Sequence, residues 1–398
     1  MTRNRIILVV LWVAAGIFAS FYGGSIPYAL FYMVLLVPVI SFLYTLYVFV
    51  RFKLFQEISE RTLVKGEATD YSFRLANEDF ISYQQTQVRF FTGMSTIPDV
   101  SEAESYCLQP GEIKKVDARL ACNYRGSYAV GVQSILIGDL FNLFHFRYPI
   151  LTKLQVVVLP RIVRLEHFGI IPLDSDSKRS MFSVTPRTDE LDIEVRKYDR
   201  GDSLRQIHWK NTARRGEFMS RKFGEELRLG VVLCMDLTST GEKEMLARAE
   251  LEDRVIESTI SIAEYCLRTA TPCSVHYCDG AQIKQMRLNS RADFDLFYHE
   301  CGQLSFKAES DCGALVEAGR LADTAARYII LTHVLSESLF SQVSRAAAHG
   351  CTAAVILFAD ALDEREQILR AYLAQSGIRL LQIHRDEDFA QVFSNTQE

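Results

Sequence analysis

Apolar residues fill the first fifty positions of the chain almost without interruption. Residues 6–22 and 26–50 contain no charged side chain, and a helix needs about 20 such residues to cross the hydrocarbon core of a bilayer. A Gly-Gly-Ser sequence separates the two runs, as in a tight turn between antiparallel helices. The pattern predicts a transmembrane helical hairpin over residues 1–53, surrounded by the lipid bilayer.

Basic residues at the ends of this hairpin predict its orientation. Arg3 and Arg5 precede the first helix, Arg51 and Lys53 follow the second, and the turn carries no positive charge. Because cytoplasmic flanks hold the excess of Lys and Arg, we expect a multi-pass cell-membrane protein with both termini and the soluble part in the cytoplasm. The competing interpretation is a cleaved signal peptide with a poor small-residue site around Ala19.

Residues 58–160 show the alternation that is typical of strands. Tyr71, Phe73 and Leu75 alternate with polar neighbours, and Gly- and Pro-containing turns punctuate the segment. No helical period intervenes, so the pattern predicts an all-β sandwich-like domain. Residues 161–228 then form a polar linker and a motif-bearing segment.

From residue 229 the pattern changes to short apolar runs that alternate with amphipathic stretches. Near-continuous apolar strands between helices predict an α/β domain over residues 229–398, with a mostly parallel sheet covered on both faces. In such a domain, ligands bind beyond the carboxyl ends of the strands. The expected strands are 230–235, 328–332, 353–358 and 378–383, and the expected helices are 250–268, 313–326, 337–349 and 363–375.

Composition narrows the classes of function. The chain has 44 Lys+Arg against 49 Asp+Glu and a net charge of -5, so it lacks the basic excess of a nucleic-acid binder, and no nucleic-acid partner is expected. The cysteine count of 9 is odd and includes no C-x-x-C. Such cysteines indicate thiols in a reducing compartment rather than a disulfide or zinc scaffold.

The first predicted strand of the α/β domain ends in an Asp followed by hydroxyl residues. Asp236, Thr238 and Thr240 have the spacing D-x-T-x-T. A carboxylate and two hydroxyls on one loop form an all-oxygen site suited to Mg2+ or Ca2+. The alternative is a structural loop between strand and helix, capped by Asp236 and Thr238.

A second constellation lies before that strand, in residues 195–211. Acidic and basic residues are interleaved there around one tryptophan, and Ser203 with Gln206 could cap a short helix that Gly216 ends. Mixed signs favour a salt-bridged structural clasp between the domains, with a partner-binding surface and catalysis as alternatives. The candidate residues are Tyr198, Gly201, Asp202, Arg205, His208, Trp209 and Lys210.

Gly201 to Leu204 also spell the nucleophile motif of GDSL-type esterases. A serine hydrolase needs a base for its nucleophile, and in those esterases a D-x-x-H supplies it. None of the 8 histidines here has an Asp three residues before it. The sequence therefore argues against a catalytic role for Ser203.

These motifs together resemble the domain of unknown function 58 family. Residues 195–226, VRKYDRGDSLRQIHWKNTARRGEFMSRKFGEE, are similar to its long Y-x-x-G-D-x-x-R-x-I-x-W-K motif. Tyr124-Arg125-Gly126-Ser127-Tyr128 and the Asp139–Phe144 segment resemble its two shorter turns, although Leu140 and Asn142 replace a Pro and a Gly. The D-x-T-x-T loop resembles the metal-ion-dependent adhesion site of von Willebrand factor A-like domains. That resemblance implies a further Asp where His333 stands.

The resemblance implies a membrane-anchored cytoplasmic protein of uncharacterised process whose relatives are often encoded beside MoxR-type AAA+ ATPases. We therefore expect a non-enzymatic adaptor whose A-like domain binds a protein partner, with a MoxR-type AAA+ ATPase as the candidate and Mg2+ as the candidate cofactor. The alternatives are a hydrolase-type enzyme with its site at the junction of the two soluble domains and a purely structural subunit of a membrane complex.

Overall fold

The computed structural model divides into two compact units, each built from several stretches of the chain. The first contains Met1–Arg161, Gly241–Asp253 and Tyr298–Leu304, and the second contains Ile162–Thr240, Arg254–Phe297 and Ser305–Glu398. The residues that the structure describes are 2–101, 103–150, 152–169, 195–197, 212–213, 216–221, 230–322, 327–349 and 351–395.

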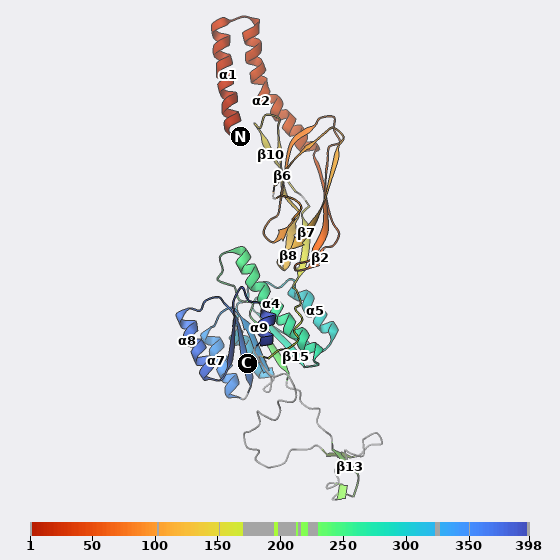
Figure 1. Ribbon diagram of the computed structural model, residues 1–398, viewed down its shortest axis with the longest axis vertical. Helices are drawn as coiled ribbons and strands as arrows, with labels where there is room; N and C mark the ends of the chain where they lie inside the picture. Colours follow the sequence, from red (N-terminus) through yellow and green to blue (C-terminus); the bar gives the residue numbers. More distant parts are fainter. Residues whose placement is uncertain are drawn as a thin grey trace. The chain divides into compact units, whose positions relative to one another are not determined.

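Two long apolar helices begin the first unit. Helices α1 (Thr2–Tyr22) and α2 (Ser25–Arg51) are joined by Gly23 and Gly24, whose φ angles of 57° and 86° suit glycine. Both are long and apolar enough to cross a membrane. The expected helical hairpin is confirmed, and Figure 1 shows the two helices running antiparallel.

The rest of the first unit consists mainly of β-sheets, as the alternation predicted. In β3, the alternating residues Thr69, Tyr71, Phe73 and Leu75 are buried, because a strand turns every second side chain to one face. Sheets β1-β3-β7-β5 and β10-β9-β4-β6 share one hydrophobic core, and β2-β11-β8 form a third sheet. The strands are β1 (Lys53–Ile58), β2 (Thr62–Val64), β3 (Ala68–Ala76), β4 (Tyr83–Phe90), β5 (Ser95–Thr96), β6 (Ala103–Leu108), β7 (Ile113–Cys122), β8 (Gly126–Val130), β9 (Val132–Gly138), β10 (His145–Tyr148) and β11 (Leu154–Leu159).

The second unit is an α/β domain around one six-stranded sheet in the order β16-β15-β14-β17-β18-β19. All neighbouring strands are parallel except β15 and β16, so the sheet is mostly parallel, as expected. The strands are β14 (Val231–Met235), β15 (Cys273–Asp279), β16 (Gln282–Leu288), β17 (Arg327–Thr332), β18 (Thr352–Phe358) and β19 (Arg379–Ile383), and a separate pair is formed by β12 (Val195–Lys197) and β13 (Met219–Arg221).

Helices cover both faces of this sheet. Residues of α6, α7 and α8 form one core with Val232, Cys234 and Tyr328, and Phe297 of α5 packs against Tyr277 on the other face. Figure 1 shows α7 and α8 on one side of the strands and α4 and α5 on the other. The helices are α4 (Met245–Arg268), α5 (Arg291–Cys301), α6 (Cys312–Ala322), α7 (Glu337–Ala348), α8 (Glu364–Gln375) and α9 (Phe389–Asn395).

Candidate functional site

The order of the α/β sheet places one candidate site at the carboxyl ends of β14 and β17. The chain order reverses between these two strands, and ligands of open α/β sheets bind where that reversal occurs. Asp236 directly follows β14, and Thr332 ends β17. The two residues, 96 positions apart in the sequence, are therefore neighbours at this edge.

Asp236 is buried within a set of hydroxyl groups. The backbone N–H and the hydroxyl of Thr238 donate to its Oδ1 over 2.9 and 2.7 Å, and the Thr332 hydroxyl donates to its Oδ2 over 2.6 Å. The first two bonds close the loop after β14, as a structural cap would. The predicted convergence of Asp236 and Thr238 is thus present, and Thr332 is a member that sequence spacing did not reveal.

Two further buried side chains follow Asp236 and Thr332 in the sequence and have polar atoms with no hydrogen-bond partner among the described residues. His333 is 7% exposed, and neither of its ring nitrogens has a hydrogen-bond partner among the described residues. Its Nδ1 lies 3.8 Å from Asp236 Oδ2. Thr240 is 6% exposed, and its hydroxyl also has no partner in the described part of the chain. Buried polar groups are usually satisfied, so such atoms indicate a capacity to bind something else.

The donors around Asp236 fit Mg2+ only in part. Its carboxylate and the hydroxyls of Thr238 and Thr332 are oxygen ligands, which suit a hard cation. However, the described residues contain no group of three or more His, Cys, Asp or Glu side chains able to hold a metal. Where a second carboxylate would strengthen the site stands His333, whose imidazole is a poor ligand for Mg2+. Metal binding by Asp236, Thr238 and Thr240 remains a prediction.

A second polar cluster lies in the first unit and is built around a buried arginine. Arg125 precedes β8, and its Nη1 donates to the backbone carbonyls of Cys301 and Leu304 over 3.2 and 2.8 Å. Its Nε lies 3.3 Å from Asp253 Oδ1, and Lys65 Nζ lies 2.8 Å from the other carboxylate oxygen. The side chains of Arg125 and Asp253 are only 4% and 2% exposed.

Burial raises the pKa of Asp253, and the adjacent Lys65 and Arg125 cations act in the opposite direction. The cluster joins the turn before β8 to the first part of α4, and each charge has a partner of opposite sign. Such an arrangement stabilises a fold and offers no exposed nucleophile. The sequence singled out Arg125 only as part of a resemblance to a turn motif.

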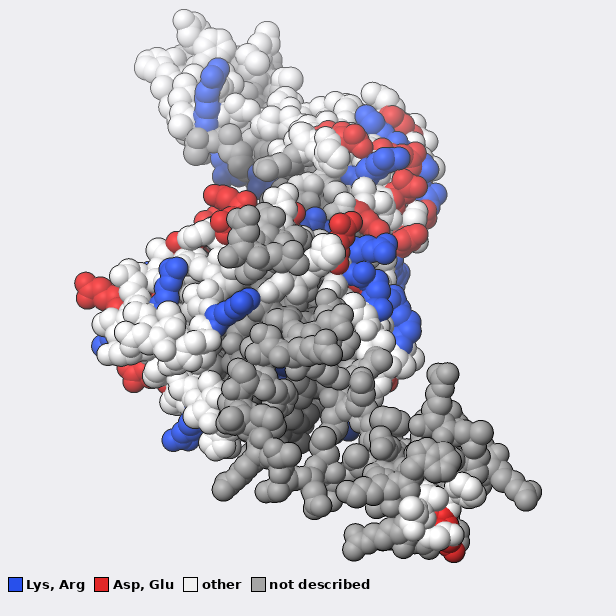
Figure 2. Space-filling view, turned by 60° about the horizontal axis from the view of Figure 1, so that its bottom comes forward, with Lys and Arg blue, Asp and Glu red and all other residues white. Residues whose placement is uncertain are grey.

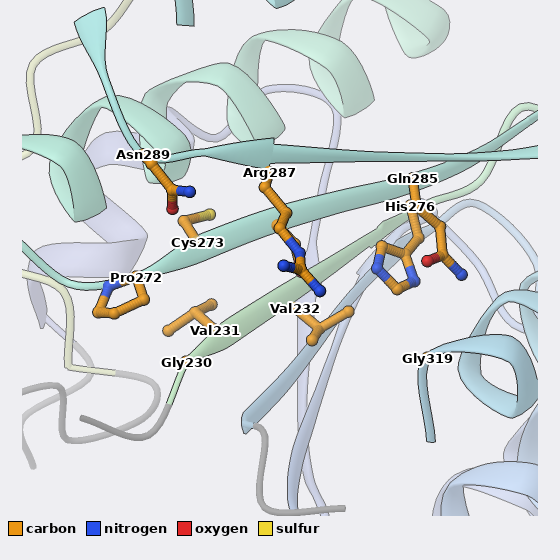
Figure 3. A pocket seen from close by; sticks show the side chains of 11 residues that line it. Gly230, Val231, Val232, Pro272, Cys273, His276, Gln285, Arg287, Asn289 and Gly319 are labelled. Atoms are coloured by element: carbon orange, nitrogen blue, oxygen red, sulfur yellow. The ribbon is translucent and has the colours of Figure 1, made fainter. Parts of the chain in front are cut away.

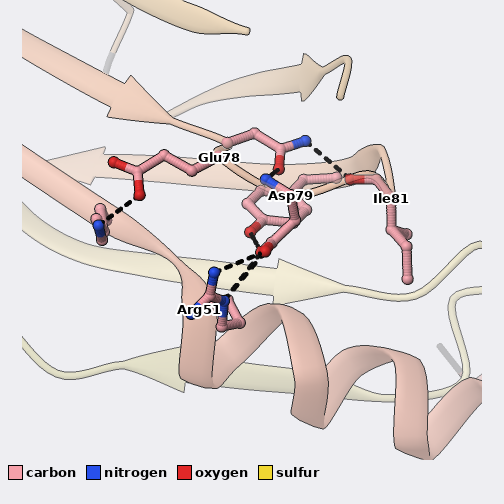
Figure 4. Close-up of polar contacts among 7 residues, drawn as sticks. Arg51, Glu78, Asp79 and Ile81 are labelled. Carbon is pink, nitrogen blue, oxygen red and sulfur yellow. Dashed lines mark hydrogen bonds and ion pairs between the residues drawn. The ribbon is translucent and has the colours of Figure 1, made fainter. Parts of the chain in front are cut away.

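A third polar network fixes the end of α2 to the sheets of the first unit (Figure 4). Arg51, the last residue of the helix, lies 3.0 Å from Asp79 in the loop between β3 and β4. The buried Tyr83 hydroxyl donates to the same carboxylate over 2.6 Å, and Lys53 pairs with Glu78 over 2.6 Å. Only Phe52, itself 2% exposed, separates α2 from β1. The helix therefore continues into the sheet without a flexible linker.

Asp139 forms a comparable attachment between α2 and the loop after β9. It is fully buried and accepts the Ser41 hydroxyl of α2 together with the backbone N–H groups of Phe141, Leu143 and Phe144. The resemblance implied a proline and a glycine in this turn, where Leu140 and Asn142 stand. Here the hydrogen bonds from the backbone of the turn to the Asp139 carboxylate hold its shape. Asn142 adopts a φ of 57°, a conformation that asparagine tolerates better than most residues.

The predicted clasp motif lies outside the described residues. Tyr198, Gly201, Asp202, Arg205, His208, Trp209 and Lys210 all belong to this part of the chain, so their roles stay predictions. Strands β12 and β13 flank the segment and pair antiparallel. Gly216 has a φ of 71° and donates its N–H to the Thr212 carbonyl, as expected of a residue that ends a helical turn.

Comparison with known proteins supports one family. Residues 194–281 match the model of the family described as "Protein of unknown function DUF58". This range includes β12, β13, Asp236 and the whole of α4 and β15. The match supports that family for this part of the chain, and no curated protein matches the chain.

Solved structures offer only weak likenesses. The CARDB domain of a Pyrococcus furiosus protein is 16% identical, with a TM-score of 0.19, and the match covers 27% of this chain and 87% of that one. A beta-glucosidase from Listeria innocua is 16% identical, with coverages of 27% and 16% and a TM-score of 0.17. Cwp6 from Clostridium difficile is 9% identical, with coverages of 86% and 39% and a TM-score of 0.17. At these TM-scores, the likenesses carry no inference about function.

Proposed function

We propose that this chain is a membrane-anchored, non-enzymatic interaction protein whose von Willebrand factor A-like domain binds a protein partner in the cytoplasm. The observation that carries the proposal is the edge around Asp236, where both ring nitrogens of His333 and the hydroxyl of Thr240 are buried with no hydrogen-bond partner among the described residues. Ligands of open α/β sheets bind where the chain order reverses, and polar atoms without hydrogen bonds at that place favour a binding role. The family resemblance makes a MoxR-type AAA+ ATPase the candidate partner.

The surface of the hairpin supports the membrane anchor. Large apolar side chains of both helices are exposed, among them Ile6 at 62% and Ile26 at 73%. Figure 2 shows the hairpin free of charge over most of its visible surface, whereas both signs of charge mingle on the sheets of the first unit. Such helices are costly in water and stable in a bilayer.

Exposed apolar residues in the loops attached to α2 support the same anchor. Phe80 follows Asp79, and Leu140 and Phe141 follow Asp139, with exposures of 80%, 57% and 52%. Because Asp79 and Asp139 both bond to α2, these side chains are available to the interfacial layer of the bilayer, where aromatic residues are enriched.

The cytoplasmic orientation is tested by thiol labelling of the full chain in intact cells. A Ser25→Cys substitution places a thiol at the turn of the hairpin without replacing a left-handed glycine, and a membrane-impermeant reagent should label it. The exposed native Cys107 serves as the internal control, and it should react only after permeabilisation. Labelling of Cys107 in intact cells would contradict the orientation.

Partner binding is tested with the full chain in detergent and the purified MoxR-type ATPase. We expect a complex whose Kd rises about tenfold in Thr240→Val and in His333→Phe, because each change removes a polar group near the proposed interface. Thr352→Val is the matched control, since Thr352 begins β18 and therefore lies at the amino ends of the parallel strands, away from Asp236. No complex with ATP, with ADP or without nucleotide would exclude this partner and favour the structural-subunit alternative.

The Mg2+ prediction needs its own measurement. If the site binds the metal, millimolar Mg2+ raises the Tm of the full chain in detergent, because a ligand of the native state stabilises it by mass action. Thr240→Val should remove that increment. A Tm unchanged by Mg2+, Mn2+ and Ca2+ would leave Asp236 as a structural loop cap while the partner proposal stands on the binding experiment alone.

A further inference from the structure

The second half of α2, residues 39–51, contacts the β-sheets of the first unit with one face. Its buried residues Ser41, Thr45 and Val48 are spaced by four and three positions. The Tyr44 hydroxyl donates to the Ser82 carbonyl over 2.6 Å. Residues at this spacing form one stripe along a helix, so this buried stripe attaches α2 to the sheets.

The opposite face of the helix is exposed and apolar. It consists of aliphatic residues spaced by three or four positions, which we call the outer stripe: Leu36, Val39, Leu43, Leu46 and Val50. Leu43 is 57% exposed and Val50 is 71% exposed. At about 3.6 residues per turn, the outer stripe lies about half a turn away from the buried stripe. The sheets therefore leave it uncovered.

Helix α2 continues beyond the start of α1. Arg5, in the first turns of α1, donates to the Leu143 carbonyl over 2.8 Å, and Ser41 of α2 donates to Asp139 in the same turn after β9. Most of residues 42–51 therefore extends past α1. A helix of 27 residues is about 40 Å long, whereas the hydrocarbon core of a bilayer is about 30 Å thick. The end of α2 thus exceeds the length that one crossing needs, and the outer stripe continues along it to the last turn.

A proline separates the two halves of α2. Pro38 lies inside the helix, and a proline at such a position removes one backbone hydrogen bond and commonly bends a helix. Figure 1 shows the last part of α2 slanting away from the axis of the hairpin toward the sheets. A slanted amphipathic helix lays one side along the bilayer surface instead of passing straight out of it.

An exposed aromatic ring lies beside the outer stripe, and the charges around it are paired. The centroid of the Phe80 ring lies 6.4 Å from that of Tyr47 on α2. The nearby cations and acids form two ion pairs, Arg51 with Asp79 and Lys53 with Glu78. Since each of these cations is neutralised by an acid, this surface offers apolar contact rather than a net charge for anionic headgroups.

We propose that the second half of α2 lies in the interfacial layer of the bilayer, with the outer stripe and the Phe80 ring in contact with lipid. This placement rests on the membrane anchor of the proposed function, and it also holds the β-sheets of the first unit at the membrane surface. The outer stripe runs from the hairpin to the last turn of α2 without a polar residue, so its cover is continuous with the lipid around the hairpin. The contact depends on apolar area and not on the charge of the headgroups.

Fluorescence quenching by brominated lipids tests this placement in the full chain. Cys107→Ser first removes the exposed thiol, since the other cysteines are buried. Single substitutions Val50→Cys, Phe80→Cys, Met33→Cys and Ala68→Cys then each carry the fluorophore NBD. The labelled chains are placed in nanodiscs of phosphatidylcholine that is brominated either close to the headgroup or close to the end of the acyl chains.

The four probes differ in the depth at which we expect them. Bromine close to the headgroup should remove most of the emission from Val50→Cys and Phe80→Cys, and bromine at the chain ends should remove less. Met33→Cys, on an exposed position near the middle of the hairpin, should show the reverse preference. Ala68→Cys is the matched control, because Ala68 is exposed at the other end of β3, about 27 Å from the loop of Phe80. It should keep its emission with both lipids.

The outcomes separate this placement from the anchor on which it rests. The placement is overturned, and the anchor stands, if Val50→Cys and Phe80→Cys are quenched no more than Ala68→Cys while Met33→Cys is quenched. An unquenched Met33→Cys would contradict the membrane anchor and the placement together. A Val50→Cys probe that resists both brominated lipid and aqueous iodide would show that a protein covers the outer stripe, which also overturns the placement. Quenching that required phosphatidylserine would overturn the apolar mode of contact.

Discussion

Each compact unit of this protein contains a buried aspartate, and the two have different surroundings. Asp253 of the first unit lies between Arg125 and Lys65, so its negative charge is matched by nearby cations. Within the described part of the chain, Asp236 of the second unit accepts bonds only from neutral groups of Thr238 and Thr332. The cations around Asp253 bind it to the elements that carry them, whereas Asp236 has no such cation beside it among the described residues and can still attract a cation or a donor.

The neighbours of the two aspartates sharpen this contrast. Arg125 also bonds to two backbone carbonyls, so the groups around Asp253 are occupied with one another. Beside Asp236, both nitrogens of His333 and the hydroxyl of Thr240 have no partner among the described residues. Burial alone therefore does not identify a binding site, and the unsatisfied neighbours are the stronger indicator.

The largest effect should follow from breaking the cluster around Asp253. Arg125→Met leaves Lys65 as the one cation beside the buried Asp253 among the described residues and removes the donor to Cys301 and Leu304. Loss of one member of a buried charge cluster costs about 3 to 5 kcal/mol, so the free energy of unfolding should fall by that amount. Urea denaturation of the full chain in detergent measures the change.

A surface ion pair of the same unit provides the control for this experiment. Lys115 lies 2.7 Å from Asp117, and its side chain is 53% exposed. Lys115→Met should change the free energy of unfolding by less than about 1 kcal/mol. If Arg125→Met were equally mild, the cluster around Asp253 would have no structural role.

Much of the fold is predictable because each element carries its own local pattern. The alternation of Tyr71, Phe73 and Leu75 predicts β3, and the apolar run before Asp236 predicts β14. Strands β15 and β16 were not predicted, since cysteine, histidine and tyrosine interrupt the apolar run in β15 and β16 is a half-exposed edge strand. A cavity that His276 and Arg287 help to line takes part of its walls from these two strands (Figure 3), so it was missed with them.

The polar clusters are less predictable because they join residues far apart in the chain. Asp236 and Thr238 are two positions apart, and their spacing alone indicates a shared loop. Arg125 and Asp253 are 128 positions apart, and the local sequence around either residue does not predict its contact with the other. A motif thus predicts a loop, while the partner of a buried charge depends on tertiary packing.

A moderate effect is expected where the neutral bonds to Asp236 are removed. The Thr332 hydroxyl donates to Asp236 and accepts the N–H of Val334. Thr332→Val conserves shape but loses both bonds, which should lower the free energy of unfolding by about 1 to 2 kcal/mol. Thr352→Val, at the amino end of β18, should change the free energy of unfolding by less than about 0.5 kcal/mol. Equal values for the two variants would argue that the bonds at Asp236 contribute nothing to stability.

A smaller effect should appear as a sensitivity to acid that comes from His276. Burial without a counter-charge lowers its pKa in the folded chain, whereas the unfolded chain keeps the usual value of about 6.5. Below that value the unfolded state binds the proton first, so stability falls as pH decreases through about 6.5 and levels off below the folded pKa. Between pH 7.5 and 5.5, the Tm of His276→Phe should fall less than that of the wild type. Identical Tm profiles would contradict a neutral, buried His276.

Thr240→Val should have the smallest effect on stability. It is also the sharpest test of the contrast between the two aspartates. Its buried hydroxyl has no hydrogen bond to lose within the described part of the chain, so Thr240→Val removes an unsatisfied group and keeps the shape. We expect the free energy of unfolding to stay within about 0.5 kcal/mol of the wild type, or to rise slightly. Because the proposed function assigns this hydroxyl to binding, the same variant should weaken the complex with the partner. Urea denaturation and partner titration on one preparation measure both quantities. A loss of stability as large as that of Thr332→Val would show that the hydroxyl is structural.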